Sequence, residues 1–194
     1  MEIKTIEGSV RAKTNVKRSV FIATASRCDS VKDAKEFISK VRKEFQDASH
    51  NCWAFRVFEN GQINEGYSDA GEPSGTAGMP ILGAIREMNL VNVAVVVTRY
   101  FGGVKLGVRG LIDAYHSAAL EALRMAKVVK LILKNVYEVR ASFEKYGEVK
   151  AEISRKGGKI FEEIFENEAK IVYISDSPIV ENSVKIGEKF VEIS

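Results

Sequence analysis

The fold is decided by residues 67–111, which read YSDAGEPSGTAGMPILGAIREMNLVNVAVVVTRYFGGVKLGVRGL. This stretch contains eight of the chain's fifteen glycines, gathered in two loops that flank a short helical pattern and an apolar run. Glycine costs backbone entropy, so a chain concentrates it where φ must be positive or where another group approaches the backbone closely. Two such loops are either turns or a surface that grips an anion. Their polar and basic residues are Ser74, Thr76, Arg99, Lys105 and Arg109.

The apolar run at residues 91–98 predicts a central strand that is buried on both faces. Before it, residues 79–88 have helical spacing with a proline in the first turn, and Thr76 or a nearby residue is expected to cap this helix. After it, the wide apolar face of residues 111–126 predicts a long helix. Each glycine loop therefore delivers a helix N-terminus, whose free N–H groups suit an anion.

Upstream, residues 3–25 alternate as strands do, with a turn at 13–15 and the stronger strand pattern at 16–25. Ser30 opens a helix that runs to Phe45, with Asp33 in the position of a capping-box partner. Residues 50–57 predict the next strand, which ends at the turn Asn60-Gly61.

After residue 134 the pattern changes. It predicts a strand at 136–143, a helix at 146–154, strands at 160–165 and 169–174, a helix at 178–185 and a closing strand at 190–193. This order, βαββαβ, is the ferredoxin-like split βαβ. The sequence therefore predicts an α+β protein with two domains, at residues 1–134 and 136–194.

Composition narrows the class of protein. The apolar content of 45% and charged content of 28% are ordinary for a globular chain. No apolar run reaches the ~20 residues of a membrane helix, and the N-terminus lacks the apolar core of a signal peptide. We expect a cytoplasmic protein that uses no membrane partner, with Cys28 and Cys52 as reduced thiols.

Charge is distributed unevenly along the chain. Residues 1–135 carry 20 Lys and Arg against 14 Asp and Glu, whereas residues 136–194 carry 9 against 12. An excess of positive charge in one part favours a polyanionic partner, although a solvated surface explains the charge equally well.

The candidate site residues fall into three groups. The basic and glycine-rich group would contact phosphate or nucleic acid through cations and backbone N–H groups. Its members are Lys17, Arg18, Ser74, Gly75, Thr76, Gly78, Arg99, Tyr100, Gly102, Gly103, Lys105, Gly107 and Arg109. Tyr100, Phe101 and Trp53 are candidates for base stacking, although such aromatic residues are more often part of a core.

The second group is an acidic pair, Asp69 and Glu72, which would act as general base or metal ligands in an enzyme, or serve only as turn residues. The third is a polar pair, His50 and Cys52, which share one face of their predicted strand. A catalytic or metal role for this pair is weighed against a packed cysteine beside a hydrogen-bonded histidine, which we favour. No Gly-Lys-Ser/Thr follows either loop and neither spacing fits G-x-G-x-x-G, which excludes the two common nucleotide-binding fingerprints.

Taken together, several segments resemble the YigZ/IMPACT family. They are SVFIA at 19–23, HNCWA at 50–54, DAGEPSGTAGMPIL at 69–82 and VTRYFGGVKLGVRGLIDAY at 97–115. The resemblance implies a first domain similar to the second domain of small-subunit ribosomal protein five. It also implies a second domain similar to a ferredoxin-like domain of elongation factor G, and involvement in translation or its regulation. The chain departs from the family pattern at Ala70, Arg109 and Asp113.

These observations favour a translation-associated protein that binds RNA or the ribosome through its glycine-rich loops, without a cofactor or metal. One alternative is an enzyme that acts on a nucleotide or phosphorylated substrate through Asp69 and Glu72. Another is a docking module for a protein regulator of translation. The family pattern has a second aspartate next to Asp69, where this chain has Ala70. The loss of one of these two adjacent carboxylates favours binding over catalysis.

Overall fold

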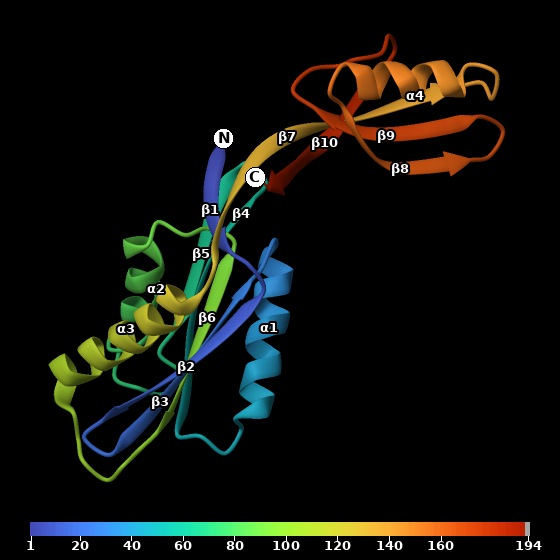
Figure 1. The fold of residues 1–194 in the computed structure, drawn as a ribbon. Helices are drawn as coiled ribbons and strands as arrows, with labels where there is room; N and C mark the ends of the chain where they lie inside the picture. Colours follow the sequence, from blue (N-terminus) through green and yellow to red (C-terminus); the bar gives the residue numbers. More distant parts are fainter. Residues whose placement is uncertain (193–194) are drawn as a thin grey trace. The chain divides into compact units, whose positions relative to one another are not determined.

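A computed structural model describes residues 1–192, and the chain divides into two compact units. The first unit is Ile3–Lys130, and the second runs from Leu131 onward together with Met1–Glu2. Both units combine helices with antiparallel sheet, which confirms the predicted α+β class (Figure 1). Strand β7 (Val128–Ala141) runs through the domain boundary expected near residue 135. Among residues 1–192, no helix is long and apolar enough to cross a membrane.

The first unit is built on an antiparallel sheet with strand order β2-β3-β6-β4-β5. The predicted central strand is confirmed, because β6 lies in the middle of this order and its residues up to Arg99 are all buried. Strand β5 has no counterpart in the sequence prediction. The bounds are β1 (Glu2–Ile6), β2 (Ser9–Val16), β3 (Ser19–Arg27), β4 (His50–Glu59), β5 (Gln62–Ser68) and β6 (Val93–Tyr100).

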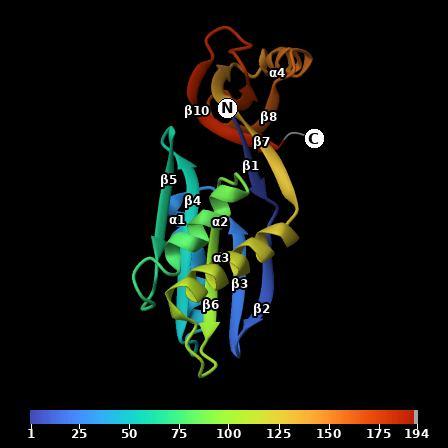
Figure 2. The ribbon, with the colours of Figure 1, turned by 90° about the vertical axis from the view of Figure 1, so that its left-hand side faces the viewer.

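Three helices cover the two faces of this sheet (Figure 2). Helices α2 (Gly78–Glu87) and α3 (Gly107–Met125) pack on one face, and α1 (Val31–Glu44) packs on the other. Successive residues of β6 alternate between the two cores: Val93, Val95 and Val97 face α2 and α3, while Ala94 and Val96 face α1. This alternation directs Arg99 towards the α2/α3 side.

The turn predicted at residues 13–15 is wrong. Strands β2 and β3 pair from Ser9↔Ser26 to Val16↔Ser19, which leaves Lys17 and Arg18 as the two-residue turn. Both have positive φ, at 44° and 68°, as the mirror-image turns of tight hairpins require. Lysine and arginine are not turn-forming residues, so strand pairing rather than local preference sets this turn.

The second unit contains β7, α4 (Tyr146–Arg155), β8 (Lys159–Phe165), β9 (Ala169–Ser175) and β10 (Val184–Glu192). Strand β9 pairs with both β7 and β8, and β10 pairs with β7. The helix predicted at 178–185 is absent. Asn182 has a φ of 65°, and the Tyr173 hydroxyl accepts from Ile179 N and donates to Ser183 Oγ, which fixes a loop instead. The closing strand begins earlier than predicted, and Ile193 lies outside the described residues.

Candidate functional site

The first glycine loop is organised by the carboxylate of Asp69. Its Oδ1 accepts hydrogen bonds from the N–H groups of Ala77 and Gly78, at 3.0 and 2.8 Å, and its Oδ2 accepts from Gly75 N at 2.9 Å. Asp69 thus occupies the N-terminus of α2. The cap was expected at Thr76 or a nearby residue, but the Thr76 hydroxyl donates to Pro73 O at 2.7 Å and Ala77 at the N-cap position has no side-chain cap.

Burial of the Asp69 carboxyl favours a higher pKa, but the hydrogen bonds from Gly75, Gly78 and Ala77 outweigh it and lower the pKa. A helix N-terminus favours a negative charge, and here the protein supplies that charge itself. The N–H groups of Gly75 and Gly78 are therefore engaged within the chain, and the exposed Ser74 lies in the same loop. These N–H groups are not free to bind a phosphate.

Ala70 has a φ of 44°, a conformation that alanine adopts at a steric cost. We expect Ala70→Gly to raise the free energy of unfolding by about 0.5–1 kcal/mol, because glycine adopts positive φ without that cost. Urea unfolding followed by circular dichroism measures the change. Ala48→Gly, at a position without positive φ, should lower stability. Equal losses in both variants would contradict the assignment of strain to Ala70.

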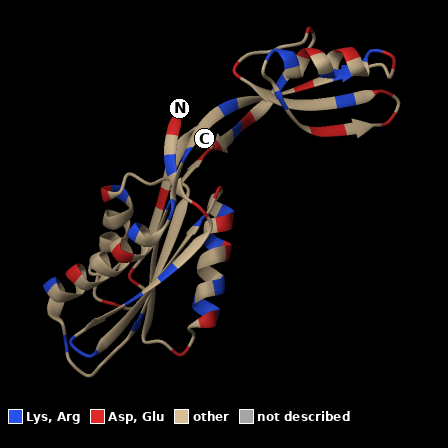
Figure 3. Ribbon diagram, viewed as in Figure 1, with Lys and Arg blue, Asp and Glu red and all other residues tan. Residues whose placement is uncertain are grey.

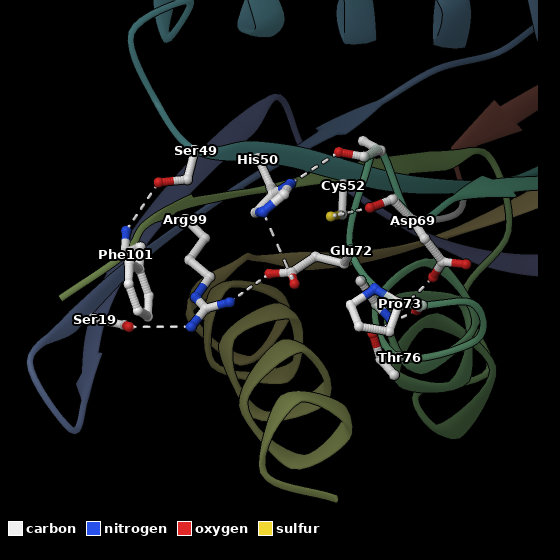
Figure 4. A network of polar contacts seen from close by, with 12 residues as sticks. Ser19, Ser49, His50, Cys52, Asp69, Glu72, Pro73, Thr76, Arg99 and Phe101 are labelled. Carbon is white, nitrogen blue, oxygen red and sulfur yellow. Dashed lines mark hydrogen bonds and ion pairs between the residues drawn. The ribbon is translucent and has the colours of Figure 1, made fainter. Parts of the chain in front are cut away.

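His50 and Cys52 lie on β4 and bond to consecutive carbonyls of the first loop. The Nδ1 of His50 lies 3.0 Å from Ala70 O, and the Cys52 thiol donates to Asp69 O at 2.9 Å (Figure 4). Burial raises the pKa of Cys52 to about 12, and a hydrogen bond to Tyr115 offsets this only in part. Cys52 therefore stays a thiol, and the geometry gives the pair a structural role in holding the loop.

A buried ion pair joins the first loop to the central strand. Arg99 Nη1 donates to Glu72 Oε1 at 2.6 Å, and the two side chains are only 6% and 4% exposed. The Tyr115 hydroxyl donates to the same carboxylate oxygen at 2.8 Å, and burial raises the pKa of that hydroxyl. The His50 Nε2 lies 3.9 Å from Glu72 Oε2. Figure 4 shows the side chains of His50, Arg99 and Glu72 converging from β4, β6 and the first loop.

Arg99 is not fully satisfied by these contacts. Its Nη2 donates to Ser19 Oγ at 3.3 Å, but its buried Nε has no hydrogen-bond partner among the described residues. The guanidinium carbon lies 5.6 Å from the ring centre of Phe21 and 5.4 Å from that of Phe101. An unpaired buried N–H donor is uncommon in proteins and calls for an explanation.

The second glycine loop is packed against the β2–β3 hairpin. A Cβ added at Gly102 would lie 2.1 Å from the backbone carbon and oxygen of Arg18, so only glycine fits there. This contact places the exposed Lys17 and Arg18 beside the loop that carries the exposed Lys105. Figure 3 shows these positively charged segments together at one end of the first unit. The structure thus brings three predicted cations into one region, which we call the basic cluster: Lys17, Arg18 and Lys105.

The N-terminus of α3 differs from that of α2. No side chain caps it, and its first turn contains no acidic residue. It opens on a pocket of about 570 Å³. The pocket is lined by Ser49, His50, Glu72, Pro73, Arg99, Phe101, Lys105, Leu106, Gly107, Val108 and Leu111.

Other predicted residues lie outside this pocket or are engaged elsewhere. Arg109 pairs with Asp113 one helical turn later, so the two departures from the family pattern partly neutralise each other. The Tyr100 hydroxyl donates to Asp47, and Trp53 packs with the core on the α1 side. Gly103 has a φ of 83°, and its backbone allows the loop to turn.

Asp69 and Glu72 serve separate roles, and no metal-binding group of His, Cys, Asp or Glu side chains occurs within residues 1–192.

Several pocket residues were missed by the sequence reasoning. Ser49, Leu106, Val108 and Leu111 were not expected to line a site. Tyr115, which donates to Glu72 but does not line the pocket, was assigned only to an apolar helix face. One signal was available. Arg99 follows Val93, Val95 and Val97 on the same face of a buried strand. Because an unpaired buried charge is costly, this position predicts a buried carboxylate as its partner.

The fold and the pocket define an α+β protein whose first unit carries a mostly apolar pocket at an uncapped helix N-terminus. A family model described as the Impact N-terminal domain matches residues 17–123. This chain belongs to the IMPACT family.

Individual relatives agree with this assignment. The IMPACT family member YvyE of Bacillus subtilis is 40% identical over 138 residues, which are 71% of this chain and 63% of that protein. The IMPACT family member YigZ of Escherichia coli is 34% identical over 147 residues, which are 75% of this chain and 72% of that protein. A crystal structure described as a hypothetical protein is 28% identical, with a TM-score of 0.71 over 89% of this chain and 84% of that one. The match spans about six tenths of the length of the Bacillus relative.

Proposed function

We propose that this chain is a translation-associated protein that binds RNA, with the ribosome as the expected source of that RNA. The observation that carries the proposal is the uncapped N-terminus of α3, which opens on the pocket beside Lys105. Backbone N–H groups at such a terminus, together with nearby cations, favour phosphate. Membership of the IMPACT family supports the association with translation, because resemblance to this family implies involvement in translation or its regulation.

The two glycine loops contribute differently to this function. In the first loop, Asp69 already neutralises the N-terminus of α2, so the loop repels a second anion. In the second, the charge of Arg99 is balanced by Glu72, and the exposed positive charge comes from the basic cluster. We therefore assign phosphate contact to the second loop and the adjacent hairpin alone.

Removing the basic cluster should weaken RNA binding and its dependence on salt. The test uses a triple variant with Lys17→Asn, Arg18→Gly and Lys105→Ala. Asparagine and glycine suit the positive φ of the hairpin turn, so the turn is kept while its charges are lost. We expect the slope of log affinity against log salt to fall by about 0.7 for each cation that contacts a single strand. Fluorescence anisotropy of labelled RNA across a salt series measures it.

The control variant loses the same amount of positive charge from α1, which packs on the sheet face opposite α2 and α3. Lys32, Lys35 and Lys40 are exposed residues of α1, and their replacement by alanine also removes three cations. This control should keep the wild-type salt slope within about 0.5. Equal slopes for the two triple variants would show that net charge, and not the basic cluster, drives binding.

A further inference from the structure

We propose that the pocket at the α3 N-terminus takes one unpaired nucleotide, with its base against Phe101 and its phosphate at the helix terminus. This inference rests on the proposed function and specifies the form of RNA that is bound. It follows from the lining of the pocket, which a phosphate alone does not explain.

The wall of the pocket is largely apolar. Pro73, Leu106, Val108 and Leu111 line it beside the ring of Phe101. Phe101 is 49% exposed, although exposing a large aromatic ring to water is unfavourable. Its backbone is fixed, because Phe101 N donates to Ser49 Oγ at 3.0 Å, and the Arg99 guanidinium lies 5.4 Å from its ring centre. A half-exposed ring beside an apolar wall is suited to stacking on a base.

The floor of the pocket is polar, in contrast to its wall. A carbonyl oxygen only accepts, so the contact of His50 Nδ1 with Ala70 O places a proton on Nδ1. The His50 Nε2 lies 3.9 Å from Glu72 Oε2, and both residues line the pocket. Arg99 also lines the pocket, is 5% exposed and has a buried Nε–H donor without a partner. Nucleobase edges present donors and acceptors side by side, which suits a floor that contains imidazole, carboxylate and guanidinium groups.

The size of the pocket sets the extent of the ligand. About 570 Å³ lies within the range of sites that enclose one small molecule. A base can enter such a pocket only when it is unstacked and unpaired, as in single-stranded loops and ends of RNA. Lys105 and Gly107 line the same pocket, so the site for the base and the site for the sugar-linked phosphate of one nucleotide are adjacent.

The test compares three probes on the full chain: a single-stranded RNA oligonucleotide, a duplex of the same length, and a free mononucleotide. We expect the single strand to bind at least tenfold more tightly than the duplex at equal salt. Measurable binding of the mononucleotide that is displaced by the single strand would support the pocket, and would identify free nucleotides as a second source of the ligand. Equal affinities for single strand and duplex would overturn the inference.

Variants at Phe101 test the stacking directly. Phe101→Ala should weaken single-strand binding by about tenfold and leave duplex binding unchanged, while Phe101→Tyr keeps the ring and should restore the preference. The exposed Phe143 is the control, since Phe143→Ala removes a ring outside the pocket. Thermal melting of each variant establishes that it is folded.

Failure of this inference can be told from failure of the proposed function. If the triple variant of the basic cluster loses RNA binding but Phe101→Ala does not, phosphate contact stands and base capture is wrong. If no RNA probe binds at low salt, both proposals fall.

Discussion

The Glu72→Ala variant is expected to lose about 3–5 kcal/mol of its free energy of unfolding. The carboxylate is 4% exposed and accepts from Arg99 and Tyr115, so its removal leaves a buried guanidinium without a counter-charge. A buried charge that loses its partner is among the most destabilising changes in a protein. Denaturant unfolding of the purified chain measures the loss.

An exposed ion pair provides the control. Arg11 and Glu44 form a pair with both side chains more than 40% exposed, and Glu44→Ala should lower stability by less than about 1 kcal/mol. The double variant Glu72→Leu with Arg99→Met should recover most of the loss, because neither charge remains buried. A Glu72→Ala loss no larger than that of Glu44→Ala would mean that water reaches Arg99.

The second large effect is expected at Asp69. Asp69→Ala removes the acceptor for three backbone N–H groups, of which those of Ala77 and Gly78 belong to buried residues. We expect a loss of about 2–4 kcal/mol in the free energy of unfolding, from the lost cap and the unsatisfied donors. Asp113→Ala, which removes an exposed carboxylate paired with Arg109, should change stability by less than about 0.5 kcal/mol.

This contribution of Asp69 should depend on pH. The folded state lowers the pKa of the carboxyl, so its stabilising effect is complete above the pKa of the unfolded chain, about 3.9. The effect is lost as pH falls through the lower pKa of the folded state. The stability difference between the wild type and Asp69→Asn should therefore be constant near neutral pH and narrow below about pH 4. A difference that stays constant down to pH 2 would contradict this role.

Elements with a strong periodic pattern could be predicted from the sequence. Strand β6 and helix α3 were predicted because their apolar residues repeat with the periods of a buried strand and an amphipathic helix. Strand β5, QINEGYS, was missed because it is polar and lies at the edge of its sheet. The turn at Lys17 and Arg18 and the loop before β10 depend on strand pairing and on Tyr173, which no local pattern reveals.

The candidate site was predicted less completely than the fold. The sequence indicated that both glycine loops deliver helix N-termini, and the structure agrees. It could not indicate that Asp69 fills one of them, because this contact depends on the path of the loop. Nor could it bring the β2–β3 hairpin against Gly102, since residues 18 and 102 meet only through the pairing of β3 with β6.

The two cysteines have a practical consequence. Cys28 and Cys52 are both buried, and burial raises the pKa of each to about 12. At neutral pH both are poor nucleophiles towards alkylating reagents. A cysteine introduced in place of the exposed Val104 would then be the one thiol of the native protein that reacts readily with a maleimide dye. Such a label next to the pocket would report ligand binding in real time, without replacing either native cysteine.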